Sequence, residues 1–434
     1  RHDLAKAQAY ASIGIDKPQL LLSERGRQRV ANALADVHHE TKHAAKSVNS
    51  SISLKVVGFL PVVGSQARGV RQLVNDLNDE AAVGQDVVHH LRKLLDGSQA
   101  TAIDLPELRA AASAMAMAEA TLAPLSRSGG GLIGPIHGAR ARFNVANDHV
   151  VGLMHDGVKV AGVVNAMLGG DGDKTYLVVG ENNAEMREQG AVLSWALMHT
   201  TAGHYRVDNA ASIGALSLKQ PVDFPLPAST NEVFGPLQPT LIWQSTNAWA
   251  DFPRSGALMA DMYAAKKHEQ VDGVVAVDVP TLQAILKLTG PVQVPGIDQP
   301  VSNANASAIL LNRLYQQFPR GDQQERQDLI AATAQAAIDK LQGSSIDPAR
   351  LAKALFAAAE GRHLLIYDAN PSTQAVAAHY GVSGAVDAKP YTSFLLAAES
   401  GVAAKLDYYV RVKEQMNVRL QADGGAFVTT KVTL

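Results

Sequence analysis

One stretch of the chain, Thr175 to Gly190, constrains the fold more than any other. It begins with a short apolar run, Tyr176 to Val179, which predicts a buried strand. The run ends at Gly180, and a second apolar run begins at Ala191. In an open α/β sheet, ligands bind just outside the carboxyl ends of the strands. The polar loop between the two runs is therefore the best candidate site; it holds Glu181, Asn182, Asn183, Glu185 and Arg187.

Residues 1–170 carry the pattern of long helices. Apolar residues recur at helical spacing from Val30 to Val37 and again from Val70 to Leu77. The segment from Gly58 to Gly64, with Pro61 inside it, predicts a reversal between two helices. Further helices are predicted over 105–122, with Asp104 as the N-cap, and over 136–168. We expect an N-terminal helical domain, a stalk or bundle, that ends at the glycine-rich segment 169–173.

The pattern changes after this segment. Short β-branched runs alternate with helical stretches, which is typical of an α/β core, expected over residues 171–345. Strands are predicted over 176–179, 191–198, 241–243 and 273–277. Helices are predicted over 254–266, 280–288, 304–316 and 322–341.

The last part, residues 346–434, is expected to complete or extend the sheet. It predicts a helix over 348–360, a strand over 364–367 and a helix over 371–380. The tail from Leu406 to Leu434 alternates apolar and polar residues around Asp423-Gly424-Gly425, which predicts a hairpin.

Composition excludes several classes of protein. The formal net charge of the 434 residues is −2, which argues against a nucleic-acid binder, since such domains are strongly basic. The chain has no cysteine, so disulfides, thiolate metal sites and cysteine nucleophiles are excluded. The sequence contains no G-x-S-x-G elbow and no Walker A motif. No stretch approaches the roughly 20 apolar residues of a membrane span. Because the chain begins at Arg1, we expect any anchor to have lain upstream.

Motifs spread along nearly the whole chain carry a family resemblance. They include Asn182 to Arg187, Asp251-Phe252-Pro253, Val271 to Asp278, Leu288 to Val292, Arg362 to Tyr367 and Lys405 to Tyr409. With these motifs the chain resembles an uncharacterised family of membrane-anchored proteins of high-GC Gram-positive bacteria, the domain-of-unknown-function family numbered 4012. The resemblance implies one transmembrane helix before the helical region. It therefore implies a location on the extracytoplasmic face of the cell membrane.

The α/β part is similar to the LytR-CpsA-Psr phosphotransferases, in the order and spacing of its features. The similar segments are Tyr176 to Met198, Asn247 to Asp278 and Leu310 to Leu341. This resemblance implies an α/β/α sandwich. It also implies transfer of a glycan from a polyprenyl-pyrophosphate carrier to a cell-wall hydroxyl. The chain departs from the Arg-x-Asp element of those enzymes, since Glu188, Gln189 and Gly190 follow Arg187.

The resemblance also implies which residues act. Arginine suits pyrophosphate because its planar guanidinium makes bidentate, charge-assisted hydrogen bonds to phosphate oxygens. The expected catalytic residues are Arg187, Arg313, Asp322 and Arg326. The expected substrate-binding residues are Asn182, Asn183, Asp251, Arg254 and Arg320. Phosphoryl transfer usually uses Mg²⁺, for which Asp251 or Asp322 is the expected carboxylate ligand.

Each of these residues also has a structural interpretation. The arginines would then cap helix ends and form surface ion pairs, and the asparagines would stabilise a turn. For Asp272 and Asp278, which flank a predicted strand, a turn or cap role is the favoured interpretation.

Two functions follow as hypotheses. The first is a cell-envelope phosphotransferase or pyrophosphatase, with the polyprenyl tail in an apolar tunnel that opens beside Arg187. The second is a non-catalytic envelope module that binds lipid-linked glycan, peptidoglycan or a protein partner. The departure after Arg187 favours the second hypothesis.

Overall fold

The computed structural model describes residues 24–50, 61–99, 101–127, 130–208, 210–318, 323–386, 395–396 and 405–434. Contacts divide the chain into two compact units. The first, the helical unit, comprises Arg1–Lys174, Thr200–Arg206 and Ser345–Lys353. The second, the α/β unit, comprises Thr175–His199, Val207–Ser344 and Ala354–Leu434.

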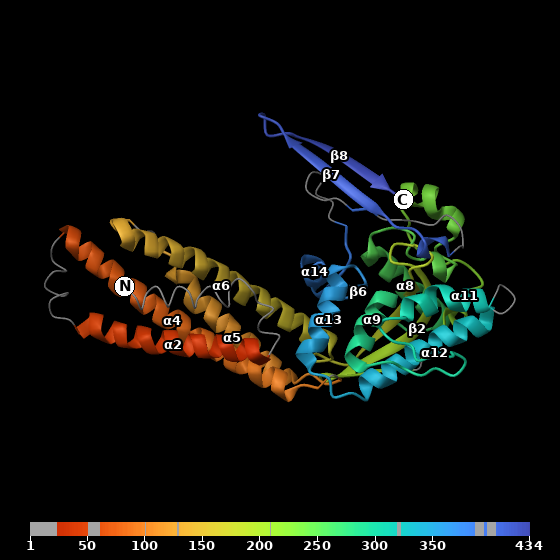
Figure 1. Ribbon diagram of the computed structural model, residues 1–434, viewed down its shortest axis with the longest axis horizontal. Coiled ribbons are helices and arrows are strands. Elements are labelled where there is room, and N and C mark those ends of the chain that lie inside the picture. Colours follow the sequence, from red (N-terminus) through yellow and green to blue (C-terminus); the bar gives the residue numbers. More distant parts are fainter. Residues whose placement is uncertain are drawn as a thin grey trace. The chain divides into compact units, whose positions relative to one another are not determined.

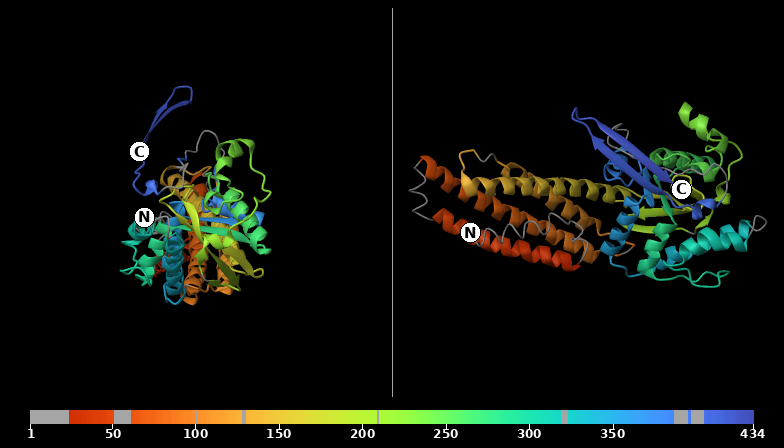
Figure 2. Two further views of the ribbon diagram at one scale, coloured as in Figure 1. Left: turned by 90° about the vertical axis from the view of Figure 1, so that its right-hand side faces the viewer. Right: turned by 45° about the horizontal axis from the view of Figure 1, so that its top comes forward.

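Long helices that lie side by side build the helical unit: α2 (Glu24–Ser50), α4 (Pro61–Gly97), α5 (Leu105–Leu122) and α6 (Gly134–Met167) (Figures 1 and 2). The predicted N-cap of α5 is confirmed, because Asp104 Oδ1 accepts a hydrogen bond from the Glu107 backbone N–H at 3.0 Å. Ala111, Met115 and Ala161 belong to the core between α4, α5 and α6. No helix in the described part of the chain is long and apolar enough to cross a membrane.

The predicted reversal over 58–64 needs correction at its end. Residues 58–60 lie outside the described residues, but Pro61 to Gly64 already belong to α4. A proline fits there because the first turn of a helix does not use its backbone N–H groups.

A mixed sheet forms the centre of the α/β unit, so the predicted α/β class is confirmed. Its strand order is β3-β2-β1-β5-β6, and β4 pairs with β2. The strands are β1 (Lys174–Asn182), β2 (Ala191–Thr201), β3 (His204–Val207), β4 (Ala211–Ser212), β5 (Gly273–Asp278) and β6 (Leu364–Asp368). Strand β5 runs parallel to β1 and antiparallel to β6.

Helices cover both faces of this sheet because its strands are apolar on both sides. Val274 and Ala276 of β5 pack into the core that contains Leu258 and Met259 of α8 (Phe252–Lys267). Val277 of β5 packs instead against a cluster with Ala358 of α13 (Pro348–Glu360). The remaining helices are α7 (Ala228–Phe234), α9 (Val279–Thr289), α10 (Ala306–Ala308), α11 (Leu314–Gln317), α12 (Gln323–Gln342) and α14 (Pro371–His379).

The helix predicted over 304–316 is interrupted, since a π-helical turn, Ile309–Arg313, lies between α10 and α11. The strand predicted over 241–243 is wrong. The backbone N–H groups of Leu241 and Ile242 both donate to the Gln238 carbonyl, at 3.0 and 2.9 Å, so the chain turns there. A 3₁₀ turn, Trp243–Ser245, follows.

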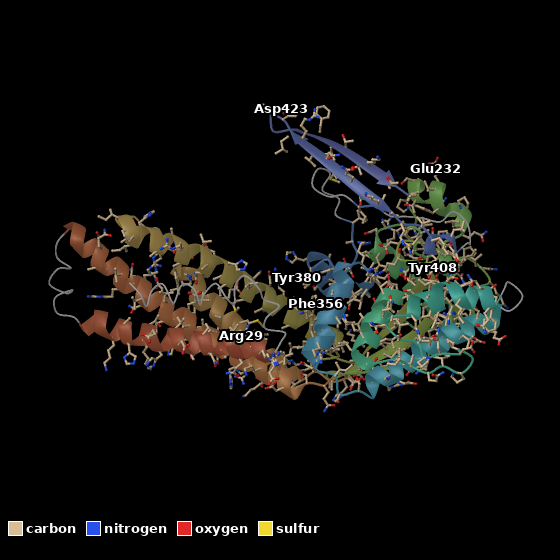
Figure 3. The ribbon with its side chains drawn as sticks, in the orientation of Figure 1. Arg29, Glu232, Phe356, Tyr380, Tyr408 and Asp423 are labelled. Atoms are coloured by element: carbon tan, nitrogen blue, oxygen red, sulfur yellow. The ribbon has the colours of Figure 1, made fainter. Side chains whose placement is uncertain are left out.

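The predicted C-terminal hairpin is confirmed as β7 (Lys413–Leu420) and β8 (Ala426–Thr433), which form a separate two-stranded sheet. Asp423, labelled in Figure 3, lies in its turn. Every residue of both strands is exposed.

Candidate functional site

The candidate site lies at one edge of the sheet in the α/β unit. Strands β1 and β5 are parallel, so their carboxyl ends meet, with Glu181 in register with Asp278. Strand β6 runs antiparallel to β5, and its first residue, Leu364, pairs with Val277 at the same edge. The loop between β1 and β2, residues 183–190, therefore meets the start of α9 and the residues just before β6. This is the location that the rule for α/β sheets predicts.

Cationic side chains gather at this loop. This cationic cluster consists of Glu185, Arg187, Tyr315, Arg326 and Lys405. The Lys405 ammonium contacts Glu185 Oε2 and lies 5.0 Å from the centre of the Tyr315 ring. Arg326 stacks over the same ring, with its Cζ 4.3 Å from the ring centre. Arg187 Nη2 lies 3.8 Å from Glu185 Oε1.

Burial and like charges shape the electrostatics of the cationic cluster. Burial lowers the pKa of Lys405, and the neighbouring Arg326 and Arg187 lower it further, while Glu185 opposes the shift. Burial raises the pKa of Tyr315 to about 12, so its hydroxyl stays protonated. That hydroxyl accepts a hydrogen bond from Asn182 Nδ2 at 2.8 Å. The tyrosine thus connects the loop to α11 and α12.

Carboxylates also gather at the loop. Glu181 Oε1 accepts a hydrogen bond from Asn247 Nδ2 at 2.8 Å, and the same amide donates to the Gly190 carbonyl. Glu188 pairs with Arg362, whose Nε lies 3.0 Å from Glu188 Oε1. Burial raises the pKa of Glu181 well above its ordinary value, and the charges on Glu188 and Asp278 raise it further.

A carboxylate–imidazole pair completes the edge. Asp278 Oδ2 lies 2.6 Å from His363 Nδ1, and its side chain is fully buried while that of His363 is 41% exposed. Asp278 Oδ1 accepts the backbone N–H of Thr281 at 3.1 Å, so Asp278 is also the N-cap of α9. The predicted cap role of this residue is confirmed. Asn183 Nδ2 donates to Asp278 Oδ2 at 2.9 Å.

The structure brings some of the predicted site residues together. Arg187 and Arg326 lie in the cationic cluster, and Asn182 reaches it through Tyr315. Asn183 joins the Asp278–His363 pair instead.

Other predicted residues lie elsewhere or are not described. Arg313 is exposed, at the end of the π-helical turn. Arg254 is half-buried in the first turn of α8, and Asp251 Oδ1 accepts the Val386 backbone N–H at 3.2 Å. Arg320 and Asp322 lie outside the described residues.

The structure also adds residues that had no predicted role in the site: Asn247, Tyr315, Arg362, His363 and Lys405. One signal was available, because Arg362-His363 directly precedes an apolar run, just as Asp278 directly follows one. Lys405 lies 220 residues from its partner Glu185, and no local pattern connects them.

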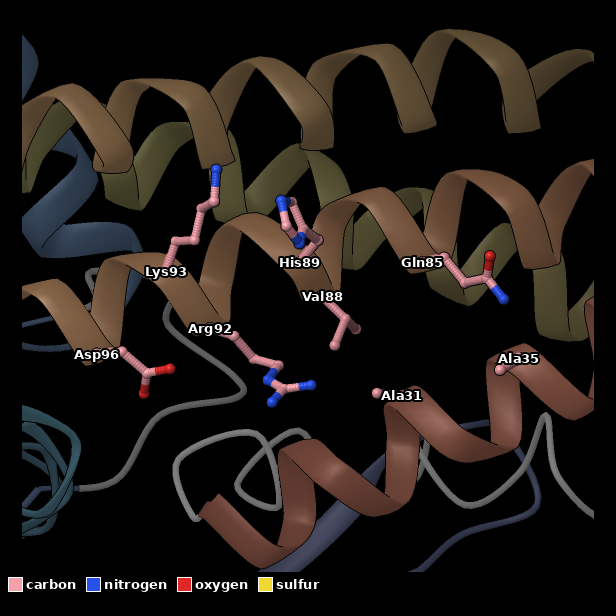
Figure 4. Close-up of a pocket in the computed structure, with 8 residues that line it drawn as sticks. All are labelled: Ala31, Ala35, Gln85, Val88, His89, Arg92, Lys93 and Asp96. Atoms are coloured by element: carbon pink, nitrogen blue, oxygen red, sulfur yellow. The ribbon is translucent and has the colours of Figure 1, made fainter.

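Two further observations concern ligands. Within the described residues, no group of three or more His, Asp or Glu side chains is arranged to hold a metal ion. A groove of about 540 Å³ lies in the helical unit, between α2 and α4 (Figure 4). Its lining mixes small, apolar and charged residues: Ala31, Ala35, Gln85, Val88, His89, Arg92, Lys93 and Asp96.

No curated protein and no solved structure matches the chain. Residues 171–315, which contain β1, the loop, β2 and β5, match an uncharacterised domain family described as "Protein of unknown function (DUF4012)".

Proposed function

We propose that this protein acts at the cell envelope, where its α/β unit binds the pyrophosphate of a polyprenyl-linked glycan and transfers the glycan phosphate to a hydroxyl of a cell-wall polymer. The observation that carries the proposal is the cationic cluster. Arg187 and Lys405 both contact Glu185, and Arg326 and Lys405 both lie over the Tyr315 ring.

Charge balance supports an anionic ligand at this cluster. Within the described residues, Arg187 and Lys405 pair with Glu185, and a second carboxylate, Asp407, accepts the Met186 backbone N–H at 2.8 Å through its Oδ2. Among the described side chains, the cluster thus brings three cations together in a partly desolvated place. A phosphate group would compensate this charge, and two guanidinium groups are suited to bind it bidentately.

The wider setting belongs to the same proposal. It includes a LytR-CpsA-Psr-like α/β/α core, a transmembrane helix upstream of Arg1 and an extracytoplasmic location in a high-GC Gram-positive bacterium. The order and spacing of the sequence motifs support it. Arg313, Arg320 and Asp322 stay predicted site residues. Mg²⁺ stays an expected cofactor.

One observation favours a second function, a non-catalytic envelope module that binds lipid-linked glycan, peptidoglycan or a protein. Arg187 is only 3% exposed, and its Nη1 donates to the Met186 carbonyl at 3.0 Å. A guanidinium that is held by its own protein in this way can stabilise the loop without touching a substrate.

The test is incubation of the purified protein with a polyprenyl pyrophosphate and with its glycan-bearing form, with and without Mg²⁺. Release of polyprenyl phosphate is measured, and native mass spectrometry detects any lipid that co-purifies. We expect turnover that Arg187→Met and Arg326→Met each reduce by at least about 100-fold, a loss of transition-state stabilisation of about 2.7 kcal/mol. Arg419→Met, on the exposed strand β7, is the matched control and should turn over normally.

Melting temperatures separate a lost site from a lost fold, since methionine keeps the aliphatic stem of arginine. Turnover that survives in both cluster variants would contradict the catalytic proposal. Binding of the lipid without any turnover, with or without Mg²⁺, would favour the binding module.

A further inference from the structure

We infer that His363 is the general base of this site and that Asp278 is its positioning residue, so that the acceptor hydroxyl gives its proton to His363 Nε2. The inference rests on the proposed function, because it assigns a role within that reaction. None of the sequence motifs assigned a catalytic role to either residue.

The geometry of the pair fixes the direction of proton transfer. Asp278 Oδ2 lies 2.6 Å from His363 Nδ1, and the fully buried carboxylate accepts two other donors, Asn183 Nδ2 and the Thr281 backbone N–H. An acceptor-only carboxylate at this distance requires the proton on Nδ1. Nε2 is then the nitrogen that can accept a proton, on a ring that is 41% exposed.

The backbone of His363 is also fixed by a hydrogen bond. Thr281, fully buried, donates its hydroxyl to the His363 carbonyl at 2.6 Å. The preceding residue, Arg362, has φ +57°, and its ion-pair partner Glu188 has the same φ. Left-handed conformations of residues other than glycine cost about 1–3 kcal/mol and concentrate at functional sites. Two such residues that pair with each other beside His363 therefore fit a preorganised site.

The loop links this pair to the cationic cluster. Asn183 and Gln189 belong to the same loop as Arg187, and Gln189 Nε2 donates to the Arg362 carbonyl. The base and the proposed phosphate site thus share one polar loop at one edge of the sheet.

The charges that face His363 favour its role as a base. Asp278 comes from β5 and Glu188 from the loop, while Arg362, the neighbouring cation, is paired with Glu188. The hydrogen bond to Asp278 raises the pKa of His363, burial opposes the shift, and the charge on Glu188 adds to it. A base with a pKa near the working pH is the most effective one for proton transfer.

In the transfer step one P–O bond forms and another breaks. The acceptor hydroxyl oxygen attacks the phosphorus that bears the glycan and forms a new P–O bond, while its proton passes to His363 Nε2. The bond from this phosphorus to the bridging oxygen breaks, and polyprenyl phosphate leaves with the electron pair. The substrate that His363 touches is therefore the hydroxyl-bearing acceptor.

The test uses two variants and one matched control in the full chain. In His363→Asn the amide can still donate to Asp278 from the position of Nδ1, but the base is absent. Asp278→Asn keeps the ring and removes the charge behind it. The control, His199→Asn, changes another half-exposed histidine, whose Nε2 lies 3.0 Å from Asp208 Oδ2. His199 also contacts Thr175, near the amino end of β1, away from the candidate site.

Two readouts are measured from pH 5 to pH 9. The first is turnover of the glycan-bearing lipid with a hydroxyl acceptor. The second is the rate at which diethyl pyrocarbonate modifies His363, followed by peptide mass spectrometry, which reports protonation of the ring without any turnover. We expect wild-type turnover to rise with pH through the titration of His363. In Asp278→Asn both midpoints should move to lower pH together.

We expect His363→Asn to turn over about 10²–10⁴-fold more slowly than the wild type at neutral pH. Its turnover should also no longer rise with pH. His199→Asn should stay within about twofold of the wild type. If His363→Asn keeps the wild-type rate and pH profile while Arg187→Met is inactive, the assignment of the base is overturned and the proposed function stands. If the wild type turns over no substrate, the proposed function is overturned, and the assignment of His363 as the general base is overturned with it.

Discussion

At the scale of single residues, Glu181 is the most unusual group of the site. Its Oε1 has Asn247 as a partner, but its Oε2 has none among the described residues, although it is fully enclosed. Burial raises the pKa of Glu181 in the folded protein above its ordinary value of 4.5. Between these two pKa values the folded protein keeps a proton on Glu181 that the unfolded chain releases. Stability from this group is therefore complete below about pH 4.5 and is lost as the pH rises towards the folded pKa.

Glu181→Gln should remove this loss. The amide still accepts the hydrogen bond from Asn247 and stays neutral at every pH. We expect the variant to be more stable than the wild type at pH 8, by about 1.4 kcal/mol for each unit by which the pKa is raised, and equal to it at pH 4.5. Urea unfolding at several pH values measures this. Glu414→Gln, on the exposed strand β7, should change nothing. An unchanged pH dependence in Glu181→Gln would show that Glu181 is ionised in the folded protein.

At the scale of elements, the loop between β1 and β2 depends on its last residue. Gly190 has φ +151°, and a Cβ atom there would lie 2.5 Å from the carbonyl carbon and oxygen of Asn182. Backbone atoms cannot move away as a flexible side chain can. The observed conformation of the loop therefore requires glycine at position 190.

Gly190→Ala should destabilise the protein by about 2–4 kcal/mol, from the steric overlap and the strained backbone together. Gly424→Ala is the control, because Gly424 also has a positive φ, +85°, but a Cβ there would meet nothing within 4 Å. Thermal unfolding followed by circular dichroism separates the two. Equal melting temperatures for both variants would contradict the steric argument.

Removal of the C-terminal hairpin, in contrast, should leave the stability unchanged. All residues of β7 and β8 are exposed, and isolated two-stranded hairpins are marginally stable. A chain that ends at Arg411 keeps Asp407, which binds the loop, and Tyr409, which accepts a hydrogen bond from Asn312. We expect it to melt within about 1 °C of the full chain. A clear drop in the melting temperature would mean that the hairpin packs on the α/β unit in solution.

At the scale of the whole molecule, the two units have separate hydrophobic cores. Leu108 and Met115 belong to cores of the helical unit, and Val274 and Leu310 belong to cores of the α/β unit. No core cluster of the described residues draws on both units. Such an arrangement favours unfolding in two steps.

A substitution at Glu80 should shift the unfolding transition of the helical unit alone. Glu80 lies on α4, and burial raises its pKa to about 7, so its contribution to stability is complete below pH 4.5 and is lost as the pH rises to 7. Glu80→Gln should stabilise the helical unit at pH 8, by on the order of 3 kcal/mol at most in its free energy of unfolding, and so raise its melting temperature. At pH 4.5 it should leave the melting temperature unchanged. Asp79→Asn, the exposed neighbour, is the control. Calorimetry should show two transitions, of which only one responds; a single shifted transition would contradict separate unfolding.

Much of the element pattern could be predicted from the sequence. Strands β1, β5 and β6 were found because each is an apolar run whose signal is local, and helix α5 because Asp104 and Pro106 mark its start. The run 241–243 failed because three apolar residues fit a strand and a turn equally well. Of the three only Trp243 is buried; it packs into the core of the α/β unit and donates its indole Nε1–H to the Leu216 carbonyl, which no local pattern signals.

The candidate site divides in the same way. The polar loop after β1 and its Arg187 could be predicted from local sequence, because residue type and strand periodicity are local properties. Which side chains face that loop depends on packing between distant segments. Lys405 and His363 reach their partners across 220 and 85 residues of chain, and the burial that shifts their pKa values exists only once distant segments pack together.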